Sequence, residues 1–276
     1  MAVVRSAQVP LRTSEGDDVP VLPLVCLTAA EQMRRTRSNC RCSVRGEVVL
    51  NRDLTILIPV INESANLKRL LPELKSKLEE LVLDAKVVVV DGGSTDDSMK
   101  VAEGLGAEVM TQSEPGYGNA LLTGFSAANT EYVLTMDADY SHEPSFIRSL
   151  WQARENGDLI IASRYVSGGK ADMSFLRSTL SRALNFVYRK ALDLRYRDLS
   201  SGFRLYRSSA LRQVEPVGRD FDFLPELLVR MHADGYRILE VPFHYRPRRD
   251  GESHAKLLKF GWAFVRTMMR MRKLRR

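Results

Sequence analysis

The stretch "AKVVVVDGGSTDD", residues 85–97, contains the pattern that decides the fold. Its first half is an unbroken run of mostly β-branched residues, which is typical of a strand buried on both faces of a parallel sheet. Its second half becomes polar and glycine-rich at Asp91. The stretch therefore predicts a buried strand whose carboxyl end opens into a loop.

The same change of character recurs on both sides of this stretch. Helical periodicity separates the apolar runs, with Ser64 as the expected N-cap of the first helix. Such alternation indicates an α/β fold with a mostly parallel sheet covered by helices on both faces. We expect strands at 54–59, 85–90, 107–111, 131–136, 158–163 and near 237–245, and helices at 64–81, 95–105, 118–128, 143–156, 175–193 and 223–233. Residues 197–207 are expected to form a loop.

Polar clusters follow four of the predicted strands, at 59–63, 91–97, 137–142 and 163–169. In open parallel sheets, ligands bind beyond the carboxyl ends of the strands. These clusters are therefore the candidate binding site.

Asp137 and Asp139 stand one residue apart in "MDADYSHEP", directly after an apolar run. Carboxylates at the end of a buried strand are costly unless a cation meets them. Mg²⁺ prefers one or two protein carboxylates together with substrate phosphates. We therefore expect both residues to hold Mg²⁺ or Mn²⁺ against a diphosphate. The plainer alternative is a polar turn, where Asp is common.

Asp91 also follows a buried strand, and Gly92 and Gly93 would let a ligand approach the backbone closely. Its carboxylate could accept hydrogen bonds from a base or a ribose, while Thr95 or Asp96 would cap the next helix. The loop at 115–124 does not satisfy the dinucleotide fingerprint, and no P-loop pattern occurs. Dinucleotide oxidoreductases and P-loop NTPases are therefore unlikely classes.

Arg164 and Arg248 are candidates for phosphate contacts, since the planar guanidinium presents paired donors to phosphate oxygens. A solvated charge run is the alternative for the basic stretch around Arg248.

Six motifs in order resemble the inverting family-2 glycosyltransferases, specifically the dolichol-phosphate mannose synthase group. They are "ILIPVINESANL", "VVVVDGGSTDDS", "MDADYSHEP", "ASRYVSGG", "DLSSGFRLYR" and "RRDGES", and they span about residues 53–257. The resemblance implies a GT-A fold, a nucleotide-sugar donor and a divalent metal. Ser141 stands where some members have Gln, and His254 stands at the family's lysine position, with Lys256 two residues later as its substitute.

The resemblance also implies residue roles. Asp137, Ala138 and Asp139 would meet the metal and the diphosphate, and Arg164 and Arg248 would contact donor or acceptor phosphate. The nucleotide pocket would be lined by Pro59, Ile61, Glu63, Val89 and Asp91, with Lys256 added to the sugar-nucleotide site.

The net charge of +7 is concentrated at the C-terminus, because eight basic and no acidic residues lie between Lys256 and Arg276. We expect three segments: an N-terminal extension over 1–50 without regular structure, a catalytic domain over 51–255 and a basic amphipathic helix over 256–276. All three cysteines fall within the first 50 residues, which fits a reducing cytosol. No apolar run is long enough to predict a membrane-spanning helix.

The terminal helix would carry Arg266, Arg270 and Lys273 on one face and apolar residues opposite. A basic amphipathic helix lies in a membrane interface. The alternative is a helix packed on the catalytic domain. The localised charge argues against a nucleic-acid binder, which would spread basic residues over a face.

The favoured function is transfer of a sugar, mannose from GDP-mannose, to a polyprenyl or dolichyl phosphate at the cytoplasmic membrane face, by a peripheral enzyme that could also use a separate anchoring partner. One alternative is a UDP-sugar donor with another lipid or glycan acceptor. A hydroxyl acceptor would need a carboxylate base, for which Asp222 and Glu226 are the first candidates. A non-enzymatic membrane-surface adaptor would bind without Asp137, Asp139 or metal.

Overall fold

The computed structural model describes residues 53–220, 222–246 and 267–272, without the side chains of residues 176 and 177. The chain divides into two units, Met1–Val49 and Leu50–Arg276, and all described residues belong to the second. The predicted N-terminal extension, Arg248, His254, Lys256 and most of the predicted terminal helix lie outside the described residues.

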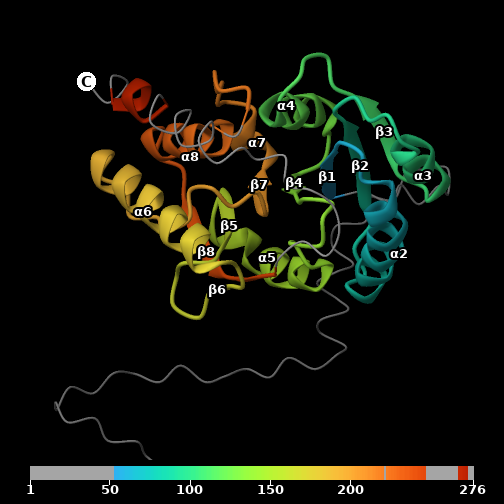
Figure 1. Cartoon of the computed structure of the whole chain (residues 1–276), viewed down its shortest axis with the longest axis horizontal. Helices are drawn as coiled ribbons and strands as arrows, with labels where there is room; N and C mark the ends of the chain where they lie inside the picture. The colour runs from blue at the N-terminus through green and yellow to red at the C-terminus, as the bar shows by residue number, and fades with distance from the viewer. Residues whose placement is uncertain (1–52, 221, 247–266, 273–276) are drawn as a thin grey trace, which may run out of the picture. The chain divides into compact units, whose positions relative to one another are not determined.

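The described residues form a seven-stranded sheet in the order β3-β2-β1-β4-β7-β5-β8 (Figure 1). Neighbouring strands are parallel except where β7 pairs with β4 and β5. The mostly parallel sheet is therefore confirmed. The strands are β1 (Leu54–Val60), β2 (Ala85–Asp91), β3 (Glu108–Thr111), β4 (Tyr132–Thr135), β5 (Leu159–Ser163), β7 (Arg204–Arg207) and β8 (Ile238–Pro242).

Helices cover both faces of this sheet, as the continuous apolar strands predict (Figure 1). Leu57, Val88 and Val90 pack with residues of α4, α6 and α8. Ile56, Ile58 and Val89 point the other way and pack with residues of α2, α3 and α5. Successive side chains of a strand alternate between the faces, so both faces need apolar residues. The helices are α2 (Ser64–Glu80), α3 (Ser98–Gly104), α4 (Tyr117–Ala127), α5 (Ile147–Ala153), α6 (Phe175–Ala191) and α8 (Phe223–Ala233).

The expected loop at 197–207 contains the one large departure from the predicted elements. Its last four residues form β7, which runs antiparallel between β4 and β5. The strand is short and begins and ends with arginine, so its sequence has no apolar run to reveal it. Arg204 is nevertheless fully buried.

Smaller elements complete the described part of the chain. A short parallel pair joins β6 (Lys170–Ala171) to β9 (His244–Tyr245), and α7 (Ser208–Leu211) follows β7. The helix predicted at 143–156 is divided into a 3₁₀ turn, α5 and a second 3₁₀ turn, at Pro144–Phe146 and Arg154–Asn156.

Residues 267–272 are helical, and their packing bears on the predicted membrane-binding tail. Thr267 and Met271 are fully buried, and Met271 belongs to the core cluster on the α8 side of the sheet. This part of the tail is therefore packed against the helices on the α8 side of the sheet, as the alternative to a membrane-bound helix expects. None of the described helices combines the length and apolar character needed to cross a membrane.

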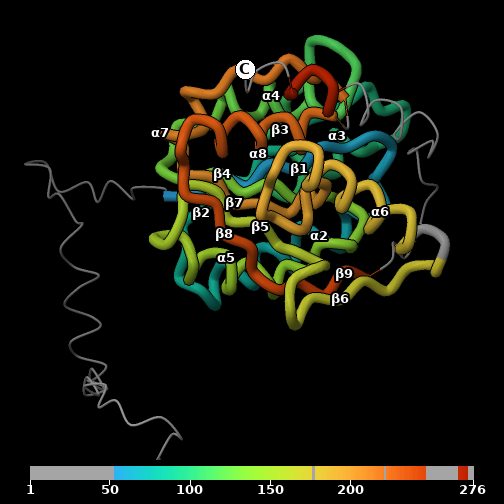
Figure 2. The backbone as a smooth tube through the Cα atoms, turned by 90° about the vertical axis from the view of Figure 1, so that its left-hand side faces the viewer, coloured from blue at the N-terminus to red at the C-terminus, as the bar shows by residue number. Residues whose placement is uncertain are grey.

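Helix α6 lies at the periphery in both views (Figures 1 and 2). Its inner side contributes Tyr188 to the core, and Leu192, just past its end, joins the same cluster. The helix ends where the chain turns into the segment that leads to β7.

Candidate active site

The two predicted metal ligands lie on the loop that follows β4. Tyr140 has a φ of 61°, a left-handed conformation that is uncommon for an aromatic residue. The loop turns back there, and the Ser141 N–H donates to Asp139 Oδ1 at 3.0 Å. Asp139 is 7% exposed, whereas the Asp137 side chain is 35% exposed. The local geometry is therefore a tight polar turn, and the Asp137 carboxylate on this turn is partly open to solvent.

Two ring side chains hold Asp137 in place, the partly buried Tyr117 and the buried His142. The Tyr117 hydroxyl donates to Asp137 Oδ1 at 3.2 Å, from the first residue of α4. Burial, followed by the nearby Asp137 charge, raises the pKa of Tyr117 well above its ordinary value. The phenol therefore stays protonated and remains a donor across the working pH range.

His142 contacts Asp137 through both ring nitrogens. The Asp137 N–H donates to His142 Nδ1 at 2.8 Å, so in the neutral ring the proton is on Nε2. Nε2 lies 3.7 Å from Asp137 Oδ2. The imidazole stacks on Phe203 with ring centroids 4.8 Å apart, which fixes its plane.

The backbone of Gly202 lies close to Tyr117 and Asp137. The Thr135 hydroxyl donates to the Gly202 carbonyl at 2.6 Å and ties it to the end of β4. A Cβ at this position would lie 2.7 Å from the Tyr117 oxygen and 3.5 Å from Asp137 Oδ1. Only glycine therefore lets the loop before β7 approach Asp137 this closely.

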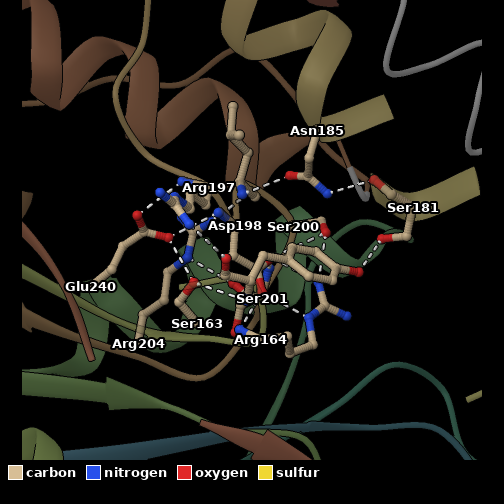
Figure 3. Close-up of polar contacts among 12 residues, drawn as sticks. Ser163, Arg164, Ser181, Asn185, Arg197, Asp198, Ser200, Ser201, Arg204 and Glu240 are labelled. Carbon is tan, nitrogen blue, oxygen red and sulfur yellow. Dashed lines mark hydrogen bonds and ion pairs between the residues drawn. The ribbon is translucent and has the colours of Figure 1, made fainter. Parts of the chain in front are cut away.

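A polar network holds that loop from behind (Figure 3). Arg164 pairs with both oxygens of Asp198, through Nε to Oδ2 and Nη2 to Oδ1, each at 2.7 Å. The Arg164 N–H also donates to Oδ2 at 3.0 Å. Asp198 is fully buried, and burial alone would raise its pKa, but the Arg164 charge and these hydrogen bonds outweigh it and lower the pKa.

Two further residues connect the network to the sheet and the backbone. Glu240 of β8 accepts the Arg197 and Asp198 N–H groups at 2.8 and 2.9 Å. Arg204 donates to the carbonyls of Leu199, Ser201 and Leu224 at 2.6–2.9 Å. A buried arginine bonded to three carbonyls fixes the course of the backbone on either side of Gly202.

The loops after β1 and β2 are joined at the expected nucleotide pocket. Asn62 Oδ1 accepts the N–H groups of Thr95 and Asp96 at 2.8 and 3.3 Å. Asp96 accepts the N–H groups of Ser64 and Ser98, at 3.1 and 3.0 Å. Asp96 therefore binds the first residues of both α2 and α3, and the expectation that Ser64 caps α2 is wrong because Ser64 is already helical.

The five expected nucleotide-pocket residues do not all face the same space. Ile61 is 43% exposed, and Pro59 and Glu63 are half-buried. The side chain of Val89 is fully buried in the core on the α2 side, so the expectation that it lines the pocket is wrong.

Asp91 is 2% exposed and accepts the N–H groups of Gly93 and Ser94 at 3.0 and 3.1 Å. The two glycines after Asp91 also have roles within the fold. A Cβ at Gly92 would lie 2.5 Å from the Ile61 side chain, and Gly93 has a φ of 96°. Gly92 therefore makes room for Ile61, and Gly93 permits the turn.

The family is identified by comparison with known proteins. A model described as glycosyl transferase family 2 matches residues 55–215. This chain belongs to that family. The resemblance drawn from the six motifs is therefore confirmed.

Two curated relatives are polyprenyl-phosphate mannosyltransferases by name. Dolichol-phosphate mannosyltransferase of Pyrococcus furiosus is 34% identical over 215 residues, which are 74% of this chain and 59% of that protein. This chain thus spans about three fifths of that relative's length. Undecaprenyl-phosphate mannosyltransferase of Micrococcus luteus is 32% identical over 215 residues, which cover 73% of this chain and 86% of that protein.

Two solved structures share the fold. Glucosyl-3-phosphoglycerate synthase from Mycobacterium tuberculosis with phosphoglyceric acid has a TM-score of 0.65, at 22% identity and 80% coverage of each chain. The same enzyme with Mn²⁺, UDP and glucosyl-3-phosphoglycerate has a TM-score of 0.62 at the same identity and coverage. The expected GT-A fold is confirmed.

The donor set of this family-2 glycosyltransferase fits a hard divalent cation. Asp137 and Asp139 offer carboxylate oxygens on one turn, and Ala138 between them is buried. Among the described residues, no group of three or more acidic, histidine or cysteine side chains forms a complete metal cage. Two carboxylates completed by donor phosphates is the arrangement that Mg²⁺ favours.

Arg164 lies near the site but is engaged in the Asp198 pair. Its Nη2 also donates to Ser200 Oγ at 2.8 Å, and its side chain is 12% exposed. Burial alone would lower the pKa of Arg164, but the Asp198 charge outweighs it and raises the pKa above its ordinary value. The sequence indicates Arg164 as a candidate site residue, but it does not indicate that Asp198 pairs with it.

Asp222 and Glu226, the candidate bases for a hydroxyl acceptor, instead anchor the terminal helix. Glu226 is fully buried and accepts the N–H groups of Val217 and Gly218 at 2.9 and 2.8 Å. It also pairs with Arg230 and Arg270. Asp222 accepts from the Thr267 hydroxyl at 3.0 Å. Glu226 is saturated with donors and is not placed to act as a base.

Arg270 therefore does not lie on an outward basic face, which corrects one residue of the predicted membrane-binding surface. Tyr117, His142, Asp198 and Gly202 were not singled out from the sequence. All four lie within the motifs or loops described above, so the sequence indicates the segments that contain them. It does not indicate which residues they contact.

Proposed function

We propose that this chain transfers mannose from GDP-mannose to a polyprenyl phosphate at the cytoplasmic face of a membrane. The observation that carries the acceptor class is the 32% identity to undecaprenyl-phosphate mannosyltransferase, over 86% of that protein. Membership of glycosyl transferase family 2 supports the reaction type.

Asp137 and Asp139 would hold Mg²⁺ or Mn²⁺ against the donor diphosphate. When bound, the ion would neutralise negative charge that develops on the leaving diphosphate. Tyr117 and His142 keep Asp137 oriented toward this position, and Gly202 leaves room for it. Preorganised groups of this kind lower the barrier because they need no rearrangement during the reaction.

The acceptor would attack directly, without a protein base. A phosphate oxygen of the polyprenyl phosphate forms the new bond to the anomeric carbon while the bond to the diphosphate oxygen breaks, which inverts the configuration. A phosphate is already ionised near neutral pH, so no proton has to be removed. The engagement of Glu226 with four donors agrees with this route.

Except for Arg164, for which the resemblance implies a phosphate contact, the remaining site residues keep the roles that the resemblance implies. Pro59, Ile61, Glu63 and Asp91 would border the nucleotide, with Ile61 the most accessible apolar side chain of the four. Arg248 and Lys256 would contact phosphate or sugar. Arg164 would contribute through the Asp198 pair, since that pair fixes the loop beside Asp137.

The test is transfer of labelled mannose from GDP-mannose to undecaprenyl phosphate in detergent, with Mg²⁺, Mn²⁺ or EDTA. We expect labelled lipid only when metal is present. UDP-glucose and UDP-N-acetylglucosamine are the parallel donors. Transfer from a UDP-sugar alone would show that GDP-mannose is not the donor. Full activity in EDTA would show that the reaction does not need a metal ion. Absence of transfer from every donor would favour the adaptor alternative.

A further inference from the structure

The terminal helix contacts two acidic residues at the start of α8. Its described residues, 267–272, lie beside α8 in Figure 1. The Arg270 guanidinium pairs with the fully buried Glu226 and lies 3.7 Å from Asp222 Oδ2. The Thr267 hydroxyl donates to the same Asp222 oxygen at 3.0 Å. Asp222 directly precedes α8 and Glu226 lies in its first turn, so the terminal helix is tied to the point where the chain enters α8.

The same two carboxylates hold the loop that leads into α8. In this loop, residues 217–220, Glu226 accepts the first two N–H groups at 2.9 and 2.8 Å. Asp222 Oδ1 accepts the last N–H group, from Asp220, at 3.2 Å. Arg219 lies between these contacts, so its backbone is held from both sides.

This loop in turn fixes the first turn of α4. The Asn119 N–H donates to the Arg219 carbonyl at 3.2 Å. A Cβ at Gly116 would lie 2.3 Å from the Arg219 carbonyl oxygen, and a Cβ at Gly118 would lie 2.8 Å from its carbonyl carbon. Because both glycines lie against the Arg219 backbone, that backbone holds the residue between them, Tyr117.

Tyr117 is the residue of α4 that reaches the proposed metal ligand. Its hydroxyl donates to Asp137 Oδ1 at 3.2 Å. Ala120 and Leu121 lie three and four residues later and hold α4 in the core on the sheet. A shift of the 217–220 loop would therefore move Tyr117 and weaken its hydrogen bond without displacing the whole helix.

We propose that Arg270 is a positioning residue for the metal site. Its pairing with Glu226 sets the 217–220 loop, the loop sets Tyr117, and Tyr117 orients the Asp137 carboxylate toward the cation. The inference deepens the proposed function and rests on it, because it takes Asp137 as a metal ligand. It gives Arg270, which the sequence places on a membrane-binding face, a role in the active site.

The test measures Mn²⁺ binding to the full chain in the presence of GDP or UDP, by the electron paramagnetic resonance signal of the free ion. Loss of a residue that orients a ligand lowers metal affinity by about 10- to 100-fold, so Tyr117→Phe should raise the Kd for Mn²⁺ by about tenfold. Arg270→Met acts through Tyr117 and should raise it by about three- to tenfold. Arg272→Met is the matched control, since Arg272 is exposed on the same helix, and its Kd should equal that of wild type.

A double variant separates positioning from a general loss of stability. If Arg270 acts through the Tyr117 hydroxyl, Arg270→Met should add nothing to the Kd of Tyr117→Phe, because the hydrogen bond is already absent. Effects that multiply in the double variant would overturn the proposal. Arg270→Lys keeps a charge beside Glu226 and should recover most of the affinity, since the contact uses one nitrogen of the guanidinium.

Amide hydrogen exchange followed by mass spectrometry tests the intermediate contacts. Arg270→Met should speed exchange in the peptide that contains the Asn119 N–H, while peptides from β5 keep wild-type rates. Thr267→Val removes a hydrogen bond to Asp222 but no charge, so it makes the same test if Arg270→Met does not fold. Unchanged exchange at Asn119 would overturn the proposal.

The outcomes also distinguish this inference from the proposed function. A wild type that binds no Mn²⁺ with either nucleotide would refute the metal site and this inference together. Equal Kd values for wild type and Arg270→Met would refute the positioning role alone and leave the metal site standing.

Discussion

The paired loops after β1 and β2 and the loop before β7 are both polar, but they are held in different ways. Asn62 and Asp96 join the first pair through hydrogen bonds to N–H groups at an exposed surface. Asp198, Arg164 and Arg204 hold the second loop with charges buried under α6 and the sheet. Water can replace a lost partner in the first region, but it cannot do so in the second.

This difference determines how strongly the loss of a polar partner destabilises each region. A hydrogen bond at an exposed site contributes about 1 kcal/mol or less, whereas a buried charge that loses its partner costs about 3–5 kcal/mol. The two regions border the same candidate site from different sides. The structure thus combines a replaceable connection near the nucleotide loops with a rigid one near the proposed metal ligands.

The largest effect is expected for Asp198→Ala. The substitution leaves Arg164 buried without its carboxylate and should lower the free energy of unfolding by about 3–5 kcal/mol. Urea denaturation followed by circular dichroism measures it. The control is Arg164→Met with Asp198→Leu, which removes both charges and should be markedly less destabilising than Asp198→Ala. If Asp198→Ala were as stable as wild type, the loop before β7 would not depend on its buried ion pair, and the proposed difference between the two regions would be wrong.

Asp139→Asn should reduce sugar transfer by about a hundredfold or more while the fold persists. The amide keeps the shape of the side chain but removes one charge from the proposed cation, and loss of a comparable electrostatic group costs about 2.7–4 kcal/mol of barrier. Initial rates across a range of Mn²⁺ concentrations measure the effect, with melting temperature as the check on folding. Wild-type rates would exclude Asp139 from the metal site.

Met271→Ala should destabilise the protein by about 2 kcal/mol or more, because the substitution leaves a cavity in the core cluster on the α8 side of the sheet. Met269→Ala is the matched control, since Met269 is 50% exposed two residues away. Its effect should stay within about 0.5 kcal/mol. Thermal denaturation compares the two variants. Equal melting temperatures would return the terminal helix to the membrane role that its sequence suggests.

The smallest effect is expected for Asp96→Asn and depends on pH. Burial alone would raise the pKa of Asp96, but hydrogen bonds from Ser98 and Ser64 outweigh it and lower the pKa to about 2. A depressed pKa stabilises the fold above the unfolded value of about 3.9, and this contribution is lost as pH falls toward about 2. At neutral pH, the free energy of unfolding of the wild type should therefore be slightly larger than that of Asp96→Asn. The difference should shrink between pH 4 and 2 in denaturant titrations, and a constant difference would contradict the assignment.

Much of the fold followed from local pattern. The apolar runs and the helical periodicity located β1 to β5 and the long helices, because a strand or a helix must repeat its buried positions at a fixed interval. The end of β4 also identified Asp137 and Asp139, since carboxylates after a buried strand are rare without a purpose. What local pattern missed was β7, which has two arginines in four residues and is a strand only because β4 and β5 lie on either side of it.

The sequence by itself determined the parallel sheet, the family and the position of the acidic pair. The tertiary structure decided which charges meet. Arg164 pairs with the buried Asp198, and Arg270 pairs with the buried Glu226. The side chain of Val89 lies in the core and not in a nucleotide pocket. The physical reason is that periodicity is a property of neighbouring residues, whereas an ion pair depends on residues brought together from distant segments. An arginine has the same place in the sequence whether it faces a membrane, a phosphate or a carboxylate, and only the folded chain distinguishes them.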